Sequence, residues 1–286
     1  MPGAPARGFR FALLTLVCLL YLTFTEEARP DPGSDRITVA FWNVYNLFDT
    51  VDDPLKQDEE FTPTGKFHWT EERLSTRIEA LASILTELDA DIVGLAEVEN
   101  MTVLKRLGQA AGYRYAYLIE REDARGIDVG ILSRKELSNV RNSGPGRGYI
   151  VGSYRGTDFA FTHWKSKLGS RTQARRLSNA AHAKTLKPPY ILLGDFNEEP
   201  SEPARQSLGS IGLMDLIERT ACASFLEKSK WICIDGAYMK PGKCRMNAQA
   251  RIVRLPAMMV GKKPDPAYSD HFPVLAETNT CDQGND

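Results

Sequence analysis

The sequence predicts an α+β (α/β) fold in which two mixed β-sheets are flanked by helices. From residue 37 to the end of the 286-residue chain, apolar strand-like runs alternate with amphipathic helical stretches. β-Hairpins occur beside βα units, a mixture that favours two mixed sheets over a doubly wound parallel sheet. No linker divides this region, and roughly 250 residues are enough for one large core. We therefore expect a single domain over residues 37–286.

The first 28 residues predict a targeting segment outside the fold. Arg7 and Arg10 give it a positive start, and residues 11–24 form an uncharged run of about the length found in signal peptides. The run is short for a membrane span, and no small-residue cleavage site follows it. We expect residues 1–28 to be a signal peptide or an N-terminal anchor, followed by a linker at 29–36. The domain would then be secreted or periplasmic.

The first half of the domain predicts two buried strands and two helices around a long polar segment. Residues 37–44 (ITVAFWNV) predict a buried strand, and 49–70 predict either a solvated loop or a functional rim. Thr70 can cap a helix whose apolar residues recur at helical spacing. That apolar stripe consists of Leu74, Ile78, Leu81, Leu85 and Leu88. Residues 91–98 (DIVGLAEV) predict a second buried strand, and Asn100 can cap a short helix after it.

The second half of the domain is richer in strands. A helix over 171–187 is ended by Pro188 and Pro189, and a small helix is expected at 202–208. Strands are predicted at 114–119, 127–133, 149–154, 157–163, 190–196 and 272–277, and the region 231–255 is rich in β-structure.

Four cysteines lie beyond the targeting segment: Cys222, Cys233, Cys244 and Cys281. An even number in an oxidising compartment suggests disulfides, and four cysteines allow three pairings. Their spacing does not resemble that of a zinc site. Cys233 and Cys244 flank a turn (KPGK), so we expect these two to pair, with free buried thiols as the alternative.

The net charge of −1 excludes a strongly basic coat for nucleic acid, so any binding of a polyanion must be local. One stretch offers it, because five basic residues and no acidic residue lie between His163 and Arg176. They are Lys165, Lys167, Arg171, Arg175 and Arg176. Such a run is either a phosphate track or a solvated helix face, and its position beside His163 favours the track.

Polar residues follow the buried strands where each of them ends. They are Asn43, Glu97, His163, Asp195, Asn197, Asp235, Asp270 and His271. Each one alone has an ordinary explanation as a turn former or strand terminator. Side chains at the same end of successive strands converge when the strands share a sheet, and binding sites form at such ends. The order of these residues along the chain therefore predicts a site.

The motifs that contain these residues resemble those of the endonuclease/exonuclease/phosphatase superfamily, which has the DNase-I-like fold. In chain order they are WNV, GLAEVEN, GIDVGILSR, THWKSK, LLGDFNEEP, ID and YSDHFPV, and they span Ile37 to Glu277. The stretch NLFDTVDDP with EFTPTGKFHW resembles a bacterial exported branch of that superfamily. The resemblance implies a four-layer sandwich of two mixed β-sheets flanked by helices.

A divalent-metal site is implied by the same resemblance. Glu97 would hold Mg²⁺ or Mn²⁺, with Asn43 beside it and Asp270 nearby. Hard oxygen ligands suit these cations, and Ca²⁺ as well, but not zinc.

The resemblance also implies catalytic roles. His271 would be the general base that activates water, oriented by Asp235. Asp195 would protonate the leaving oxygen or hold the nucleophile. Asn197 and His163 would donate hydrogen bonds to phosphate oxygens as charge develops. A histidine suits the role of base because its ordinary pKa lies near neutrality.

The sequence departs from the superfamily pattern at two places. Tyr45 stands where some relatives have a carboxylate, and Gly236 begins a strand that is usually strongly apolar after the late aspartate. Arg125 and Asp128 lie in a stretch that lines the cleft in relatives and are further candidates for substrate binding, with Lys165, Lys167 and Arg171. The two other histidines are not expected to act: His68 would pack in a loop, and His182 lies in a helix.

These features predict an exported, metal-dependent phosphodiesterase, and first of all a nuclease of low sequence specificity with nucleic acid as its partner. The alternatives are a phospholipid phosphodiesterase of the sphingomyelinase kind, another phosphoesterase of this fold, or a binding module without activity. A lipid enzyme would expose an apolar hairpin, for which the region 231–260 is the candidate. Its apolar residues are Trp231, Ile232, Met258, Met259 and Val260. No obligate protein partner is evident from the sequence.

Overall fold

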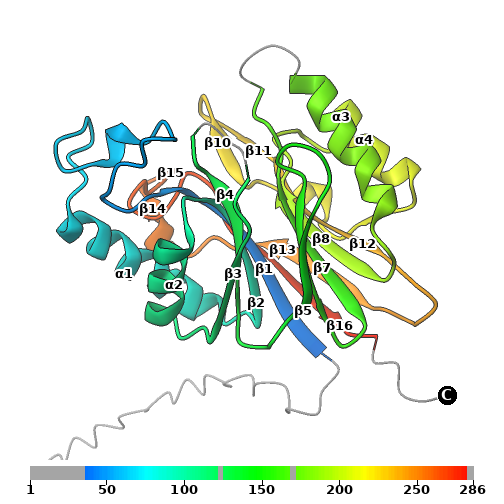
Figure 1. Ribbon diagram of the computed structural model, residues 1–286. Coiled ribbons are helices and arrows are strands. Elements are labelled where there is room, and N and C mark those ends of the chain that lie inside the picture. The colour runs from blue at the N-terminus through cyan, green and yellow to red at the C-terminus, as the bar shows by residue number, and fades with distance from the viewer. Residues whose placement is uncertain (1–35, 122–124, 168–171, 282–286) are drawn as a thin grey trace, which may run out of the picture.

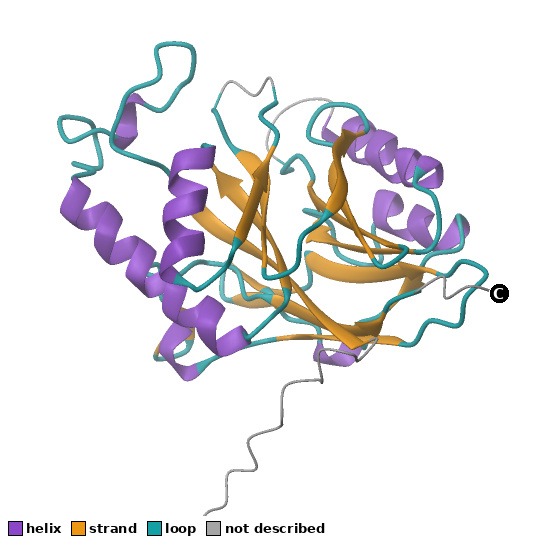
Figure 2. Ribbon diagram, turned by 60° about the horizontal axis from the view of Figure 1, so that its bottom comes forward, coloured by secondary structure: helices purple, strands orange, loops and turns teal. Residues whose placement is uncertain are grey.

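Two six-stranded β-sheets packed face to face form the centre of the protein, with helices on both outer faces (Figure 1 and Figure 2). The computed structural model describes residues 36–121, 125–167 and 172–281. The predicted fold class is confirmed: the layers run helix, sheet, sheet, helix, and both sheets are mixed. The targeting segment predicted at 1–28 lies outside the described residues.

The first sheet has the strand order β13-β16-β1-β2-β4-β3. Its strands are β1 (Arg36–Leu47), β2 (Ile92–Val98), β3 (Tyr115–Leu118), β4 (Asp128–Ser133), β13 (Ala248–Ile252) and β16 (Val274–Asn279). The central strand β1 is parallel to β2 and antiparallel to β16. Because side chains alternate along a strand, Phe41 packs between the sheets while Trp42 packs under the helices.

The second sheet has the order β5-β6-β7-β8-β12-β9. Its strands are β5 (Ser138–Ser143), β6 (Tyr149–Tyr154), β7 (Thr157–His163), β8 (Tyr190–Asp195), β9 (Met214–Asp215) and β12 (Asp235–Lys240). β7 and β8 are parallel, whereas β12 is antiparallel to β8. The sheets approach closely where Gly94 meets Phe161, since a Cβ on Gly94 would lie 2.2 Å from the Phe161 ring.

Helices α1 (Glu71–Leu88) and α2 (Met101–Ala110) cover the first sheet, and α3 (Thr172–His182) and α4 (Pro203–Ser210) cover the second (Figure 2). Both expected caps are present: the side chain of Thr70 accepts from Arg73 N, and that of Asn100 from Val103 N. Short 3-10 turns lie at Glu59–Phe61, Ala183–Thr185, Arg219–Ala221 and Pro256–Met258. Two small hairpins complete the fold. One is formed by β10 (Phe225–Glu227) and β11 (Lys230–Ile232), and the other by β14 (Met259–Val260) and β15 (Lys263–Pro264).

Several elements differ from the sequence-based expectation, among them α3 and β5. The helix expected over 171–187 is shorter: α3 ends at His182 and a 3-10 turn leads to the two prolines. Strand β5 was not predicted at all. It lies at the edge of the second sheet with its side chains exposed or half-buried, so its sequence (SNVRNS) lacks an apolar pattern.

The predicted pairing of Cys233 with Cys244 is wrong. The disulfides join Cys222 to Cys233 and Cys244 to Cys281, with Cα–Cα distances of 5.2 and 5.9 Å. The reason is that Cys233 precedes β12 and Cys244 follows it, so an extended six-residue strand separates them. An extended strand rises about 3.3 Å per residue, which places its ends far beyond disulfide range. The first disulfide instead closes the β10–β11 hairpin.

Among the described ranges, the structure contains no helix that is both long and apolar enough to cross a membrane.

The two disulfides should contribute unequally to stability. Cys244–Cys281 closes a sequence separation of 37 residues, and Cys222–Cys233 one of 11. Loop-closure entropy predicts that replacing the first pair by serine lowers the free energy of unfolding by about 4 kcal/mol, and the second by about 3 kcal/mol. Urea unfolding of the oxidised parent and both double variants measures this. A larger loss from the short loop would show that native packing, and not chain entropy, sets the order.

Candidate active site

The register of the second sheet places three predicted residues side by side. His163 at the end of β7 and Asp235 at the start of β12 are both paired with Asp195 at the end of β8. Residues that pair across neighbouring strands point to the same face of a sheet, here the face between the two sheets. All three side chains are buried. The prediction that polar strand ends converge is therefore met in this sheet.

The first sheet adds its polar residues from the opposite side. The Asn43 amide nitrogen on β1 donates to Asp195 Oδ2 at 3.1 Å and lies 3.4 Å from Glu97 Oε1 on β2. Glu97 sits at a register shift of β2 with a left-handed backbone (φ 64°), a bulge that re-aims its side chain. One side chain thus joins the acidic residues of both sheets.

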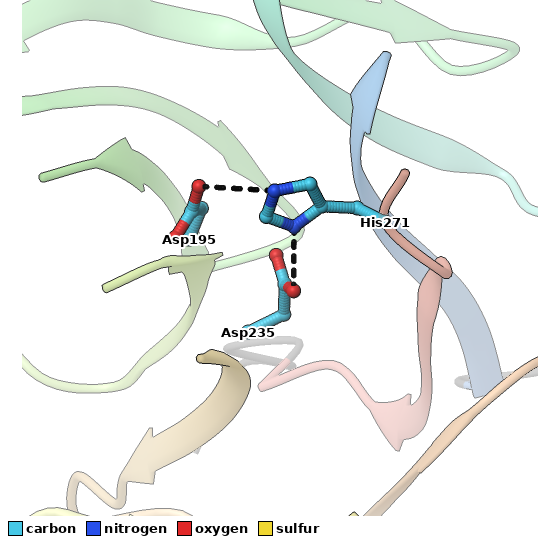
Figure 3. A group of neighbouring side chains, drawn as sticks. All are labelled: Asp195, Asp235 and His271. Carbon is cyan, nitrogen blue, oxygen red and sulfur yellow. Dashed lines mark hydrogen bonds and ion pairs between the residues drawn. The ribbon is translucent and has the colours of Figure 1, made fainter. Parts of the chain in front are cut away.

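His271 and Asp235 form the centre of the site (Figure 3). The Nδ1 atom of His271 lies 2.8 Å from Asp235 Oδ2, while Nε2 faces Asp195 Oδ2 at 3.8 Å. The backbone of His271 is fixed as well: its nitrogen donates to Ser269 Oγ, and its carbonyl accepts from the Trp42 indole. With Nδ1 donating to a carboxylate, Nε2 is left to take up a proton.

The departure from the family pattern at Gly236 has a structural reason. The buried guanidinium of Arg205 lies over this glycine, and a Cβ there would be 2.1 Å from Arg205 Nη2. Arg205 donates to the carbonyl oxygens of Asp235 at 3.0 Å and Cys233 at 2.7 Å. A large side chain at position 236 would displace this clamp, which holds the backbone that presents Asp235.

The buried charges shift the pKa values of the site. Burial alone would lower the pKa of His271, but the Asp235 and Asp195 carboxylates outweigh it and raise the value to about 10. Burial raises the pKa of Asp195 to about 7, against the opposing effect of His271. The carboxylates therefore favour the protonated ring, and the deprotonated fraction of His271 that can act as a base grows as the pH approaches this pKa.

His163 is neutral by contrast. Burial, together with the neighbouring Arg147 guanidinium, holds its pKa well below the usual range. Its Nε2 lies 3.6 Å from Asp195 Oδ2 and 3.8 Å from Glu97 Oε1, and Arg147 Nη1 lies 3.3 Å from its Nδ1. A neutral ring with an N–H beside two carboxylates can donate a hydrogen bond to an oxygen placed there.

Glu97 and Asp270 fit a hard divalent cation. Within the described part of the chain, Asp270 Oδ1 is buried without a hydrogen-bond partner. Burial and, against the effect of His271, the nearby Glu97 carboxylate raise the pKa of Asp270. Besides its ion pair with His271 Nε2 at 4.0 Å, this buried carboxylate oxygen has no hydrogen bond from the described residues, and a cation bound beside Glu97 would satisfy it. Asp195, Asp235 and His271 also have ligand atoms within 4.8 Å of one another and form a second group that could hold an ion.

Asn43 and Asn197 take part through other contacts than those expected. The Asn43 side-chain oxygen accepts from Tyr45 N at 3.0 Å, so its nitrogen is the atom that faces the acids. Asn197 donates its side-chain nitrogen to the Trp164 carbonyl at 2.9 Å and its backbone N–H to Asp195 Oδ1 at 2.8 Å. In this arrangement Asn197 fixes the turn that carries Asp195.

The substrate-binding candidates are dispersed. Arg125 reaches the site indirectly, through a hydrogen bond to Asn46, whose backbone nitrogen donates to Glu97. Asp128 is buried, and its Oδ2 accepts from the backbone of Arg121. Lys167 forms an exposed ion pair with Glu202. Arg171 lies outside the described residues.

The expected basic track is only partly a surface. Arg176 is buried in an ion pair with Glu198 (2.7 Å), so it belongs to the structure and not to a phosphate track. The two discounted histidines lie apart from this site. His182 ends α3, and its Nε2 contacts Ser143 Oγ. His68 is exposed and not packed as expected.

A basic pocket beside His163 was missed by the sequence analysis. It has a volume of about 390 Å³, and its lining includes Arg121, Asp128, Arg147, Lys165 and Arg175. The key residue is Arg147, which touches both the pocket and His163. Its signal in the sequence is the SGPGRG turn, where glycines with positive φ on both sides of Arg147 let the chain turn back. Three residues predicted from the sequence line this pocket: the substrate-binding candidates Asp128 and Lys165, and Arg175 of the basic run.

Solved structures share this architecture at low identity. An endonuclease/exonuclease/phosphatase family protein from Bacteroides thetaiotaomicron aligns over 86% of this chain and 95% of its own, with 18% identity and a TM-score of 0.62. A mannosyl-6-phosphatase from Bacteroides thetaiotaomicron VPI-5482 aligns over 85% and 99%, with 18% identity and a TM-score of 0.60. An AP endonuclease from Archaeoglobus fulgidus aligns over 84% and 98%, with 17% identity and a TM-score of 0.59. No curated protein matches the chain.

A family model decides the classification. The model of the endonuclease/exonuclease/phosphatase family matches residues 38–210, which is more than half of the chain. The match includes Asn43, Glu97, His163 and Asp195, and the fold agrees with it. The chain therefore belongs to the endonuclease/exonuclease/phosphatase family and is a hydrolase of phosphoester bonds.

Proposed function

We propose that this protein is an exported, divalent-metal-dependent phosphodiesterase that cleaves nucleic acid with low sequence specificity. The observation that carries the proposal is the contact between the buried acid and histidine site and the basic pocket. Arg147 touches His163, and with Arg121, Lys165 and Arg175 it lines that pocket. Basic side chains beside a hydrolytic site suit a substrate that has further phosphates on either side of the phosphate that is cleaved.

The proposed chemistry follows from the distances. His271 Nε2 takes a proton from water, while Asp235 holds the ring through Nδ1. Asp195, whose raised pKa allows it to carry a proton, faces the same space and serves the leaving oxygen or the nucleophile. The N–H of His163 donates to a phosphate oxygen. The role given to Asn197 as a direct donor stays a prediction, since its nitrogen is bound to Trp164.

Glu97 and Asp270 would hold Mg²⁺ or Mn²⁺, with Ca²⁺ as a further ion of the same kind. A divalent cation there supplies charge neutralisation of the phosphate oxygens. Asn43 would keep Glu97 and Asp195 in place from between them.

Low sequence specificity is expected because the proposed contacts of the basic residues near the site are to phosphates, and phosphate contacts carry no direct sequence information. The likeness to an AP endonuclease supports a nucleic acid as substrate. Export is supported by the sequence of residues 1–28 and by the two disulfides, which persist in oxidising compartments.

Among the alternatives, the lipid enzyme has the weakest support. Ile232 and Met258 are buried, Trp231 and Met259 are packed against the core, and Val260 is 63% exposed. A single exposed valine is a small surface for membrane entry. A phosphomonoesterase is the second candidate, since the basic pocket of about 390 Å³ is also of a size for a phosphorylated sugar and the fold is shared with a mannosyl-6-phosphatase. An inactive binding module is disfavoured because both histidines and all the expected acids are in the site.

A substrate panel tests the proposal. Plasmid, linear DNA, RNA, sphingomyelin vesicles, mannose 6-phosphate and a bis-aryl phosphodiester are each assayed with Mg²⁺, Mn²⁺ or Ca²⁺, and with a chelator. We expect metal-dependent cleavage of a polynucleotide whose kcat/KM falls as salt rises, and a weaker fall with salt in a Lys165→Ala variant. Turnover of mannose 6-phosphate or sphingomyelin with intact DNA and RNA would refute the nuclease proposal and select the corresponding alternative.

Glu97 and His271 should both be indispensable, for reasons that metal concentration separates. Glu97→Gln removes a metal-binding charge, so added metal should restore part of the activity by mass action. His271→Ala removes the base, so the rate should fall roughly 10²–10⁴-fold whatever the metal concentration. Glu79→Gln, an exposed change on α1, is the matched control. Near-parental activity of His271→Ala would disprove the assignment of the base.

The pH–rate profile should report the His271–Asp235 pair. A base acts only when deprotonated, so the acid limb of kcat/KM follows the pKa of His271. Asp235 raises that pKa, and Asp235→Asn should therefore move the acid limb to lower pH while the plateau rate falls because a weaker base remains. Profiles of parent and variant at saturating metal measure the shift. An acid limb that stays in place would mean that another group controls it.

A further inference from the structure

The polar segment expected between residues 49 and 70 folds into an aromatic lobe, defined here as Phe61 to Trp69. Figure 1 shows this segment projecting beside α1. The Phe61 ring stacks on Phe48 at 4.0 Å between centroids, lies 4.9 Å from Phe67 and meets Trp69 edge-on at 6.2 Å. Phe61, Phe67 and Trp69 thus form one cluster of rings, which stacks on Phe48 just after β1.

The aromatic lobe is held rigidly. Phe67 N donates to Glu60 O, Trp69 N to Thr62 O, and the Trp69 indole nitrogen to Phe48 O at 3.0 Å. The turn requires glycine at Gly65, since a Cβ there would lie 2.1 Å from the Glu59 carbonyl oxygen. A wall that is ordered before binding loses little conformational entropy when a ligand arrives.

A cavity of about 800 Å³ lies between this lobe, the start of α1 and the loop at 266–267. Its lining is mainly apolar and includes Tyr45, Phe61, Phe67 and Trp69. Tyr45 is 45% exposed and Phe67 39% exposed, and the Lys66 ammonium lies 4.9 Å from the centroid of the Phe67 ring. The cavity also has polar groups for the edges of a ligand, from Asn46, Thr70, Glu72 and Arg73.

This cavity adjoins the candidate active site. Tyr45 N donates to Asn43 Oδ1 at 3.0 Å, and Asn46 N donates to Glu97 Oε2 at 3.1 Å. Both residues have left-handed backbones (φ 52° and 61°), which turn the chain out of β1 and send the Tyr45 side chain toward solvent. Tyr45 is therefore linked to Asn43 by one hydrogen bond, and its chain neighbour Asn46 is linked to Glu97 by another.

Arg77 on α1 connects the two chain segments that lie between the cavity and the candidate active site. The buried guanidinium of Arg77 donates to the carbonyls of Val44 and Tyr45 at the end of β1 and to those of Pro266 and Ala267 in the loop before Asp270. One arginine therefore connects the cavity floor to the end of β1, which carries Asn43, and to the loop that precedes Asp270. These contacts hold the backbone of Tyr45 in place beside the site.

We propose that this cavity is a nucleobase subsite: it receives the base next to the cleaved phosphate, stacked on Tyr45 and Phe67. The inference rests on the proposed nuclease function. Flat exposed aromatic faces with polar groups at their edges suit a heteroaromatic ring, which offers a π-face for stacking and nitrogen and oxygen atoms for hydrogen bonds. Arg73, which lines the cavity and donates a hydrogen bond to the Phe67 carbonyl, adds a positive charge to the wall. Stacking is sequence-tolerant, in keeping with low specificity.

The test is equilibrium binding of a short oligonucleotide that carries one 2-aminopurine, whose fluorescence falls on stacking. It is performed in a His271→Ala background to prevent cleavage, with the 2-aminopurine moved along the strand. Tyr45→Ala should weaken binding roughly 5- to 150-fold and abolish the quenching at one position of the strand. Tyr45→Phe keeps the ring and should retain both. Leu55→Ala, an 87% exposed apolar residue outside the cavity, is the matched surface control.

The outcomes separate the subsite from the proposed function. Thermal melting shows that each variant is folded. An oligonucleotide with an abasic residue at the quenched position should bind the His271→Ala protein weakly. Its affinity should match that of the unmodified oligonucleotide for the protein that also carries Tyr45→Ala. The subsite would be overturned if Tyr45→Ala left the affinity and the quenching unchanged in the His271→Ala background. The nuclease proposal would still stand if the enzyme that retains His271 cleaved polynucleotide. Tight binding of sphingomyelin vesicles that Tyr45→Ala abolishes, without binding of oligonucleotides, would assign the cavity to an acyl chain. Failure of the parent to cleave any polynucleotide would refute the function itself.

Discussion

The amide of Asn43 is buried between the two sheets, and its nitrogen donates to Asp195 of the second sheet and approaches Glu97 of the first. The backbone carbonyl of the same residue accepts from Ser269, which in turn holds the nitrogen of His271. One residue at the end of the central strand thus connects the acids of both sheets and the segment that carries the proposed base. Buried carboxylates need such partners, since an unpaired charge in the interior is costly. The geometry of the rest of the site depends on this connection.

The concentration of buried charge explains the contrast between the two histidines. His271 lies between carboxylates, which raise its pKa, whereas His163 is buried against Arg147, and its pKa is lowered. Two residues of the same type therefore suit opposite tasks, one to take up a proton and the other to donate a hydrogen bond as a neutral ring. Arg205 supports the arrangement from behind, where it binds the backbone that carries Asp235.

The surroundings of the site differ in chemistry on its two sides. The contacts run from the apolar cavity through Asn46 to Glu97, on to His163 and Arg147, and so to the basic pocket. The first side offers flat aromatic faces and the second offers cations. A polynucleotide has both matching parts, flat bases and phosphates, in each repeating unit, whereas a phosphorylated sugar has no flat ring to stack on the aromatic side.

The sequence by itself determined the order of the buried strands, the caps at Thr70 and Asn100 and the polar residues at the strand ends, because apolar patterns and caps depend on neighbours in the chain. It also indicated that Asn43, Glu97, His163, Asp195, Asp235 and His271 belong together, since residues at strand ends converge on one edge of the sheets. The tertiary structure alone decided the disulfide pairing, the burial of Arg176 against Glu198, the approach of Arg147 to His163 and the aromatic lobe beside Tyr45. Each of these depends on which distant segments are brought into contact, and a local pattern carries no information about the partner that packing will place opposite it.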